Sequence, residues 1–364
     1  MDDFDRNVYC IGGLPFDAVD LSKTMSRLRD AKHKKSSCFL TTPNLNFLAL
    51  SQNDVDFRNS VLRSDIVIAD GAPIVWMAKL LGIPIQERVA GSTLFEALGN
   101  EWRRKMKVYF FGGPSGVAAE ACAHINKKST GLTCVGYYAP GFGTVDEMSE
   151  KTIIENINQS DADFLVVALG AKKGQAWIVN NLDKITIPLV SHLGAVVNFE
   201  AKRLKRAPVR LQKIGLEWAW RIKEEPHLWR RYWNDGWFLL KFLMAKILPY
   251  MIWIRFNQPR LKRLAPKSTV ALDDMGLNVN MIVAGVVMDP VSTHVRSLLR
   301  QASLSNKNVE LNLADAEYLS FGMLGLLLLL KKQLDKQGNH LKIINLQPAM
   351  KKLMGWSGMS YLIE

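Results

Sequence analysis

Short apolar runs alternate with amphipathic stretches over roughly the first 200 residues of the chain. Each run ends in Gly, Asp, Thr or Tyr and is followed by apolar positions at helical spacing. The runs are residues 38–42, 65–70, 108–113, 134–138, 164–170 and 188–194. Strands that alternate with helices form parallel sheets covered on both faces, so this pattern predicts an α/β domain over residues 1–200.

Polar residues and glycines stand at the ends of these predicted strands. They are residues 42–44, 70–71, 112–114, 138–143, 170 and 194. Open α/β sheets bind ligands just beyond the carboxyl ends of their strands. The recurrence at six strand ends therefore predicts a single ligand-binding crevice.

The positive charge of the chain is concentrated in one segment. Between Lys202 and Lys267 there are 17 Lys and Arg residues against four acidic residues, a net charge of +13 that equals the formal net charge of the whole chain. The same segment contains six of the ten tryptophans. A basic, Trp-rich segment suits anionic lipid headgroups or nucleic acid. Its aromatic residues stand among Leu, Ile and Met, which favours a membrane surface over nucleic acid.

Residues 237–254 are the most apolar part of that segment, interrupted by Lys241, Lys246 and Pro249. A spanning helix needs about 20 mostly apolar residues, and each central lysine opposes insertion by about 3 kcal/mol. We therefore expect an interfacial or shallowly inserted helix pair bent at Pro249. A buried helix of a soluble domain is the alternative. Residues 201–267 are accordingly predicted to form a basic, helical, membrane-associating appendage.

A second region with apolar periodicity begins near Ser268. It includes a predicted strand at residues 341–346 and a Leu-rich helix at residues 323–336. These features predict an independent small α/β domain over residues 268–364.

Other features bound the class of protein. The N-terminus is acidic and has no long apolar run behind it, so we expect no signal peptide. The four cysteines lack C-x-x-C spacing, which predicts reduced core thiols in a cytoplasmic protein and neither a disulfide frame nor a zinc site. The six histidines show no ligand spacing. We expect no metal and no other cofactor.

Several short motifs follow one another in the first 235 residues. They are residues 42–44 (TPN), 69–76 (ADGAPIVW), 88–95 (RVAGSTLF), 110–113 (FFGG), 169–178 (LGAKKGQAWI), 206–208 (RAP), 216–221 (LEWAWR) and 229–232 (WRRY). In order and spacing they resemble the WecG/TagA/CpsF family of bacterial glycosyltransferases. The resemblance implies a Rossmann-like sheet followed by a membrane-associating appendage.

The resemblance also implies an activity and a place in the cell. Members of the family move N-acetylmannosamine-type or related sugars from a UDP-sugar to an undecaprenyl-diphosphate-linked saccharide, in the synthesis of exopolysaccharide, teichoic acid or surface antigens. This chemistry implies the cytoplasmic face of the inner membrane. The rival hypothesis is a non-catalytic membrane scaffold.

Displacing UDP from a sugar with inversion requires a base for the acceptor hydroxyl and positive charge for the departing diphosphate. Asp70 is a carboxylate at a predicted strand end followed directly by glycine, and the resemblance places the family's proposed base there. The alternative role for Asp70 is to cap the next helix.

The resemblance implies roles for three further residues near Asp70. Thr42 and Asn44 match the family's T-x-N and would hydrogen-bond the sugar or Asp70; a helix cap is the alternative for Asn44. Arg88 matches an arginine near the acceptor or the diphosphate.

Glycines and an aromatic turn are expected on the nucleotide side. Gly112, Gly113 and the turn that begins at Tyr137 suggest a close approach of the backbone to the nucleotide, although such turns are often merely tight. Gly170 and Gly194 stand at strand ends of the same kind.

Two departures from the family leave the donor sugar open. The family's G-x-P-x-Q-E-x-W is here GAKKGQAW at residues 170–177, where Gln175 stands next to the usual glutamine position. Asn198 occupies a position where aspartate is common.

Four arginines match appendage arginines thought to reach over the pocket and hold diphosphate. They are Arg206, Arg221, Arg230 and Arg231. Contact with lipid headgroups alone is the alternative, and the two roles are compatible.

Residues 309–332 resemble part of a STAS domain, the fold of anti-sigma-factor antagonists. Regulatory members have a D-S-S-G turn with a phosphorylatable serine, whereas this chain has Ser320-Phe321-Gly322-Met323. The change favours a docking role, either self-association or the binding of polysaccharide-assembly proteins.

Overall fold

The computed structural model describes residues 2–363, without the side chains of Val209 and Lys213. Contacts divide the chain into two compact units. One comprises residues 19–75 and 87–236, and the other comprises residues 1–18, 76–86 and 237–364. These units differ from the three consecutive segments expected from the sequence, because the first 18 residues pack with the C-terminal part of the chain.

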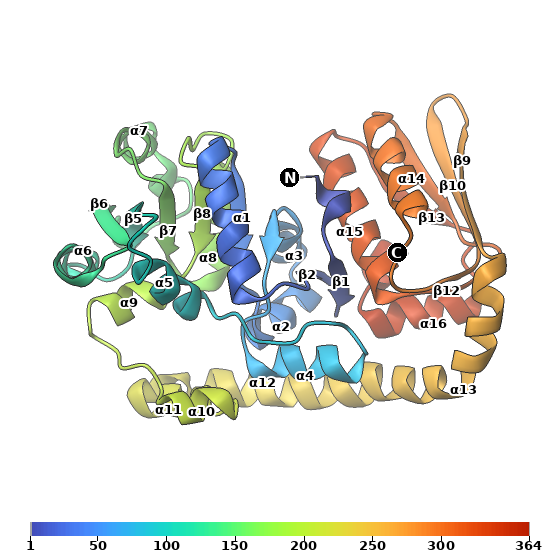
Figure 1. Ribbon diagram of the computed structural model, residues 1–364, viewed down its shortest axis with the longest axis horizontal. Helices are drawn as coiled ribbons and strands as arrows, with labels where there is room; N and C mark the ends of the chain where they lie inside the picture. The colour runs from blue at the N-terminus through green and yellow to red at the C-terminus, as the bar shows by residue number, and fades with distance from the viewer. Residues whose placement is uncertain (1, 364) are drawn as a thin grey trace. The chain divides into compact units, whose positions relative to one another are not determined.

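The first unit is built on a six-stranded sheet with the strand order β4-β3-β8-β7-β5-β6 (Figure 1). The strands are β3 (Cys38–Thr41), β4 (Ile66–Val67), β5 (Met106–Gly112), β6 (Leu132–Tyr138), β7 (Phe164–Ala168) and β8 (Leu189–His192). All neighbouring strands are parallel, so their carboxyl ends meet at one edge of the sheet. This confirms the predicted parallel α/β sheet, with one strand in each of the six apolar runs.

Helices cover both faces of this sheet. The helices α1 (Leu21–Lys34), α5 (Gly91–Gly99), α6 (Val117–Lys128) and α9 (Val196–Glu200) share one apolar core with it. The helices α7 (Lys151–Gln159) and α8 (Ala171–Asn181) share the core on the other face, where α2 (Leu45–Asn53) and α3 (Val55–Leu62) also lie, α3 against α8.

Side chains alternate between the two cores, as the pleat of a strand requires. Along β5, Val108 and Phe110 enter the first core, while Tyr109 and Phe111 enter the second. Trp177 of α8 is fully buried and stacks on Phe111 with ring centres 4.2 Å apart. Large side chains on both faces explain why the strands read as continuous apolar runs rather than as alternating ones.

The cysteines are not all reduced thiols, contrary to the expectation from the sequence. Cys122 of α6 and Cys134 of β6 form a disulfide, with Cα atoms 5.1 Å apart. Helix α6 leads into β6 and packs against it, which brings two cysteines without a recognisable spacing motif together. Cys10 and Cys38 are buried and take no part in that disulfide.

The second unit contains a smaller mixed sheet with the order β12-β10-β11-β13, and β9 pairs with β10. Its strands are β9 (Thr269–Asp274), β10 (Asn278–Val287), β11 (Asn308–Asn312), β12 (Ala316–Leu319) and β13 (Leu341–Ile344). Its helices are α14 (Thr293–Leu304), α15 (Phe321–Lys336) and α16 (Pro348–Ser357). The predicted Leu-rich helix is α15, whose residues from Phe321 to Leu330 are all buried.

An N-terminal hairpin belongs to this second unit. Strands β1 (Val8–Ile11) and β2 (Leu14–Asp17) pair antiparallel and pack on α15. The approach is so close that a Cβ at Gly325 would lie 2.6 Å from the Val8 carbonyl oxygen. The C-terminal region therefore does not form a core from its own residues alone.

The basic segment forms short helices followed by one long helix. The short ones are α10 (Val209–Lys213) and α11 (Glu217–Glu224), and the long one runs through α12 (Trp229–Phe242), a π-helical turn (Leu243–Ile247) and α13 (Leu248–Leu264). The expected break into a helix pair at Pro249 is wrong, because residues 226–267 form a continuous helix. The π-helical turn includes the residue whose carbonyl the Pro249 ring would otherwise meet, which lets the helix continue. The remaining helix, α4, covers Ala72–Leu80.

Candidate active site

Two loops at one edge of the six-stranded sheet carry the predicted base and its neighbours. Residues 42–44 follow β3, and Asp70 follows β4. The Asp70 amide donates to the Pro43 carbonyl at 3.0 Å, which ties the two loops together. The Val89 amide donates to the Ala69 carbonyl at 3.0 Å, so the segment before α5 lies beside the β4 loop.

A glycine allows these segments to come so close. A Cβ at Gly91, the first residue of α5, would lie 2.5 Å from Leu193 Cδ2 and 3.6 Å from the Thr42 side chain. Gly71 has a φ of +112°, a backbone conformation that residues with a side chain rarely adopt. A Cβ at Gly71 would lie 3.7 Å from the Asn44 Cβ. The start of α5 is thus packed against the exits of β3 and β8, next to Asp70.

Asp70 is a partly buried carboxyl with competing charges around it. Burial raises the pKa of Asp70 to about 6, and the negative charge of Glu217 acts in the same direction. Arg88, the amide of Gly91 and, more weakly, Arg206 act in the opposite direction. A carboxyl that changes protonation near pH 6 suits proton removal at neutral pH, because a general base works best with a pKa near the working pH.

Two of the predicted diphosphate ligands lie in this neighbourhood, and both are paired with carboxylates. Arg88 forms an ion pair with Glu217, and both side chains are mostly buried. Arg206 forms an ion pair with Glu96, and its Nη2 donates to Thr93 Oγ1 at 3.0 Å. The structure therefore brings Asp70, Thr42, Arg88 and Arg206 to one place.

Glu217 is the residue of this site that sequence reasoning missed. It is the first residue of α11 and the only acid in the motif LEWAWR, in which only Arg221 was singled out. The available signal was that Glu217 is one of only four acids in a strongly basic segment, where an acid needs a reason to be present.

The sequence matches a known protein family over most of its length. The sequence model of the glycosyl transferase WecG/TagA/CpsF family matches residues 9–251. The chain belongs to this family of glycosyltransferases.

Curated relatives carry a common name. A protein of Bacillus spizizenii is 28% identical over 223 residues, which cover 61% of this chain and 85% of the relative. Proteins of Bacillus subtilis and Staphylococcus aureus are 24% and 21% identical, with 54% and 60% of this chain and 76% and 84% of the relatives covered. All three are named N-acetylglucosaminyldiphosphoundecaprenol N-acetyl-beta-D-mannosaminyltransferase.

The other predicted arginines of the glycosyltransferase lie further along the appendage. Arg221 pairs with Glu225 at 2.7 Å and lies over the Phe199 ring at 5.3 Å. Arg230 and Arg231, at the start of α12, lie over aromatic rings of their sequence neighbours at 5.6 and 4.7 Å. The arginines that lower the pKa of Asp70 most are Arg88 and Arg206 and not these three.

The residues expected on the nucleotide side are spread along the carboxyl edge of the sheet. Gly112 is the last residue of β5 and Gly113 follows it, with φ values of +101° and +86°. Gly170 precedes α8, and Gly194 follows β8. Tyr137 is exposed on β6, at the opposite edge from β4 and about 24 Å away at ~4.8 Å per strand. The six strand ends thus form a row, in which Tyr137 is not a neighbour of Asp70.

Two of three predicted polar residues have roles within the protein itself. Asn44 caps α2, where its Oδ1 accepts from the Phe47 amide at 3.2 Å, as the alternative for this residue proposed. Gln175 is fully buried, and its Nε2 donates to Thr41 Oγ1 at 3.3 Å. Asn198 lies in α9 and is partly buried.

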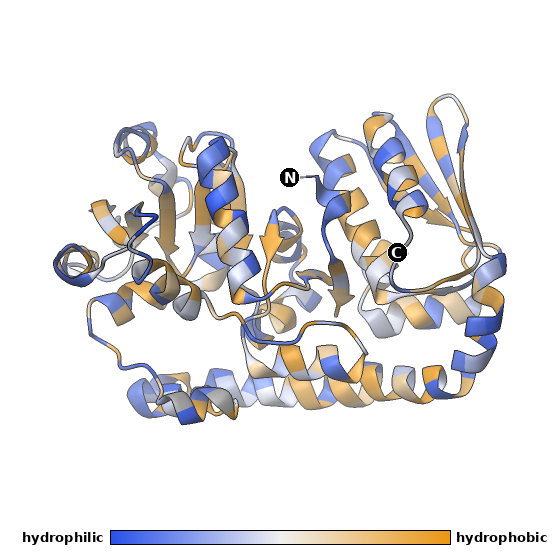
Figure 2. Ribbon diagram, viewed as in Figure 1, coloured by the Kyte–Doolittle hydropathy of each residue, from blue (hydrophilic) through white to orange (hydrophobic). Residues whose placement is uncertain are grey.

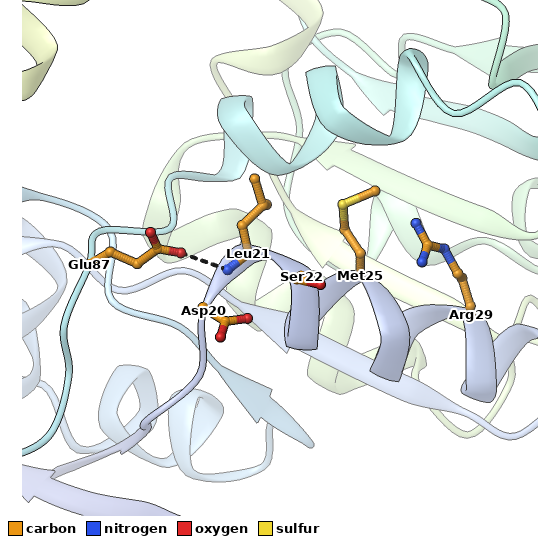
Figure 3. A pocket seen from close by; sticks show the side chains of 6 residues that line it. All are labelled: Asp20, Leu21, Ser22, Met25, Arg29 and Glu87. Atoms are coloured by element: carbon orange, nitrogen blue, oxygen red, sulfur yellow. Dashed lines mark hydrogen bonds between the residues drawn. The ribbon is translucent and has the colours of Figure 1, made fainter.

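A pocket of about 390 Å³ lies beside the start of α1 (Figure 3). Two carboxylates that line it show how the loop that carries Arg88 is held. Glu87 Oε1 accepts from the Leu21 amide at 2.8 Å, and Asp20 caps the same helix through the Lys23 amide at 2.7 Å. Both carboxylates are thus occupied at the start of α1. Glu87 thereby anchors the residue before Arg88 to the start of α1.

His192, at the end of β8, is a core residue. Its Nε2 hydrogen-bonds the Leu169 carbonyl at 2.5 Å, and burial lowers its pKa. Within residues 2–363, no three His, Cys, Asp or Glu side chains are grouped as metal ligands would be.

Proposed function

We propose that this glycosyltransferase moves an N-acetylmannosamine-type or related hexose, with inversion, from a UDP-sugar to an undecaprenyl-diphosphate-linked saccharide. The observation that carries the proposal is Asp70, a partly buried carboxyl with a pKa raised to about 6 beside Arg88 and Arg206. The names of the relatives, which specify an N-acetylmannosaminyl transfer and a diphosphoundecaprenol-linked sugar, support the substrates. The products would serve exopolysaccharide, teichoic acid or surface-antigen synthesis.

In the proposed reaction Asp70 is the general base. It takes the proton of the acceptor hydroxyl as that oxygen forms a bond to the anomeric carbon. The bond from that carbon to the diphosphate oxygen breaks, and its electron pair leaves with UDP. Arg88 and Arg206 supply positive charge where the negative charge develops.

The donor is proposed to lie along the row of strand ends. The left-handed glycines Gly112 and Gly113 stand at the carboxyl end of β5, and Gly170, Gly194 and Asn198 stand between them and Asp70 in the strand order. Tyr137 would contact the outer end of the donor. Gln175 is proposed to support the β3 exit through Thr41 rather than to touch the sugar, because its side chain is buried.

An exposed apolar stripe on the long helix supports membrane association. Figure 2 shows hydrophobic residues interspersed with hydrophilic ones along this helix. Eight large side chains recur every three or four residues, and each is at least 42% exposed: Trp229, Trp233, Trp237, Leu240, Met244, Leu248, Ile252 and Phe256. Four-residue steps drift by about 40° around an α-helix, and the additional residue of a π-helical turn rotates later positions back by roughly 100°. The π-helical turn at Leu243–Ile247 therefore keeps the stripe on one side of the helix.

The stripe favours a helix that lies along the bilayer surface. The helix is long and apolar enough to cross a membrane, and only 17% of its most apolar window is buried. Lys246, one of the two lysines that oppose insertion, donates to the Gly355 carbonyl at 2.6 Å. We propose that the stripe enters the headgroup region of an anionic membrane, on the cytoplasmic face of the inner membrane.

The C-terminal region is proposed to be a constitutive interaction module, for self-association or for polysaccharide-assembly proteins. Ser320 is 2% exposed, caps α15 through the Met323 amide at 3.2 Å and donates to Asp289 Oδ1 at 2.9 Å. A serine so enclosed is a poor substrate for a kinase, which supports the absence of a phospho-switch.

A transfer assay tests the proposal. The full-length protein is incubated with UDP-N-acetylmannosamine and undecaprenyl-diphosphate-linked N-acetylglucosamine in anionic vesicles, and lipid-linked products are resolved by mass spectrometry. We expect one added sugar and one released UDP per turnover, and related UDP-hexoses define the donor range. Failure to consume any UDP-sugar with any lipid-linked acceptor would show that the proposed function is wrong.

A further inference from the structure

The guanidinium groups around Asp70 are occupied by carboxylates of the protein itself. Arg88 is paired with Glu217, and Arg206 with Glu96. A carboxylate presents two oxygens to a guanidinium in the same forked geometry as a phosphate does. Each glutamate therefore fills a position that a phosphate could take.

The two pairs differ in their surroundings. The Glu96 side chain is 60% exposed, whereas the Glu217 and Arg88 side chains are 18% and 19% exposed. Water screens the Arg206 pair strongly and the Arg88 pair much less. Arg88 and Glu217 are also the two charges that act most strongly on the pKa of Asp70.

A shielded guanidinium must keep a partner, because a buried charge left alone is costly. Arg88 therefore needs an anionic partner in the ligand-free protein as well. Glu217 meets this need from the first residue of α11, where the helix dipole stabilises a carboxylate even after it leaves Arg88. A phosphate can thus replace Glu217 on Arg88 without leaving either Arg88 or Glu217 with an uncompensated charge.

We propose that Glu217 is an internal counter-ion that occupies Arg88 in the ligand-free enzyme and is displaced by a diphosphate group of the substrate. The inference rests on the proposed function for the identity of the diphosphate. Glu217 acts through Arg88 and is a positioning residue. Its departure would release the first turn of α11 from the loop that carries Arg88, so the appendage would respond to substrate.

Binding of inorganic diphosphate to the full-length protein, measured by calorimetry, tests the inference. Glu217→Gln removes the competing charge and should tighten binding about tenfold, the size typical of one hydrogen bond to a charged group. Glu120→Gln is the matched control, because Glu120 pairs with Arg203 and that change removes the same charge away from Asp70. It should leave the affinity unchanged. In an Arg88→Gln background, Glu217→Gln should have no further effect.

Glu217→Asp keeps the negative charge and should bind diphosphate like the wild type. If Glu217→Gln and Glu217→Asp both weaken binding, Glu217 is only a structural latch and the inference is wrong. Unchanged affinity in Glu217→Gln, or no binding of diphosphate by wild type and variant alike, would also overturn it.

The pH profile of transfer gives a second readout that a latch would not move. Glu217 raises the pKa of Asp70, so Glu217→Gln should shift the acidic limb to lower pH. The binding measurement requires no sugar transfer, which separates the two failures. Tighter diphosphate binding without transfer from any UDP-sugar would leave this inference standing and refute the proposed function.

Discussion

Two clusters of buried charge in this protein each combine carboxylates with basic side chains, but they shift the pKa of a carboxyl in opposite directions. In the second unit, Arg6 is fully buried and forms a two-point contact with Asp17, at 2.7 and 3.2 Å. Arg6 also donates to Asp3 at 2.8 Å, and Lys332 lies 3.1 Å from Asp3. The pKa of Asp3 is lowered, because Lys332 and Arg6 together outweigh the burial that would raise it.

The cluster around Asp70 is arranged in the other way. The arginine that acts on it most strongly, Arg88, is already paired with Glu217, whose charge opposes that of Arg88, and burial dominates. The pKa of Asp70 is raised to about 6 as a result. The comparison teaches that a carboxylate with its own matched cations supports the fold, whereas one left with a shared cation is available for chemistry.

The largest expected effect is the loss of turnover in Asp70→Asn. An amide cannot accept the acceptor proton, so turnover should fall by roughly 10²–10⁴, the usual contribution of a general base. Asp161→Asn is the matched control, because Asp161 is exposed, pairs with Lys107 and has the left-handed backbone that Asn also tolerates. Turnover of Asp70→Asn within a few-fold of the control would remove Asp70 from the mechanism.

In the Arg6 cluster the same chemical change should instead destabilise the protein. Asp17→Asn leaves the buried Arg6 without its main partner, which should lower the free energy of unfolding by about 3–5 kcal/mol. Asp274→Asn, which weakens an exposed pair with Lys307, should cost less than about 1 kcal/mol. Denaturant unfolding of the two variants measures the difference, and equal losses would mean that burial of the Arg6 cluster has been overestimated.

Asp70→Asn should have the opposite effect on stability, and a smaller one. The folded-state pKa of Asp70 lies above its ordinary value of 3.8, so folding favours the protonated form. That contribution is present below about pH 4 and is lost as the pH rises through 6. Asp70→Asn should therefore unfold at a higher temperature than wild type at pH 7, with little difference at pH 4. A lower unfolding temperature at pH 7 would show that Asp70 supports the fold as Asp17 does.

The smallest effect is expected on the surface of the appendage. Reversing Arg230 and Arg231 to Glu should weaken binding to anionic vesicles several-fold at low salt. The difference should shrink at physiological salt, where charges are screened over about 8 Å. Replacing Trp233 and Trp237 by Ser should weaken binding at both salt concentrations, because apolar insertion is not screened. Co-sedimentation measures both, and salt-independent loss in the Arg230 and Arg231 variant would contradict an electrostatic role.

The sequence was sufficient to predict the sheet, because both faces of its strands are buried. Residues on both sides of β5 enter apolar cores, which produces an unbroken apolar run that is easily recognised. The position of Asp70 followed in the same way, since carboxyl ends of parallel strands share one edge. Arg88 and Arg206 were also anticipated near the diphosphate, although only through the family resemblance.

Features that depend on long-range contacts were beyond the sequence. Glu217 meets Arg88 across 129 residues, and no local pattern signals such a pair. The N-terminal hairpin packs on α15 near the other end of the chain, so the expected independence of the C-terminal region does not describe the contacts. The disulfide depends on the packing of α6 on β6, and continuity through Pro249 depends on a π-helical turn that the local sequence does not signal.

Asp70 is proposed to act as the base, with a pKa set by burial and by Arg88, which it shares with Glu217. The most direct test is the pH dependence of kcat/KM for sugar transfer by the wild-type enzyme, which reports groups of the free enzyme. We expect the rate to fall on the acidic side with a midpoint near pH 6, because Asp70 must be ionised to accept the proton. A rate that stays level down to pH 4, or an acidic limb that persists in the residual activity of Asp70→Asn, would contradict the account.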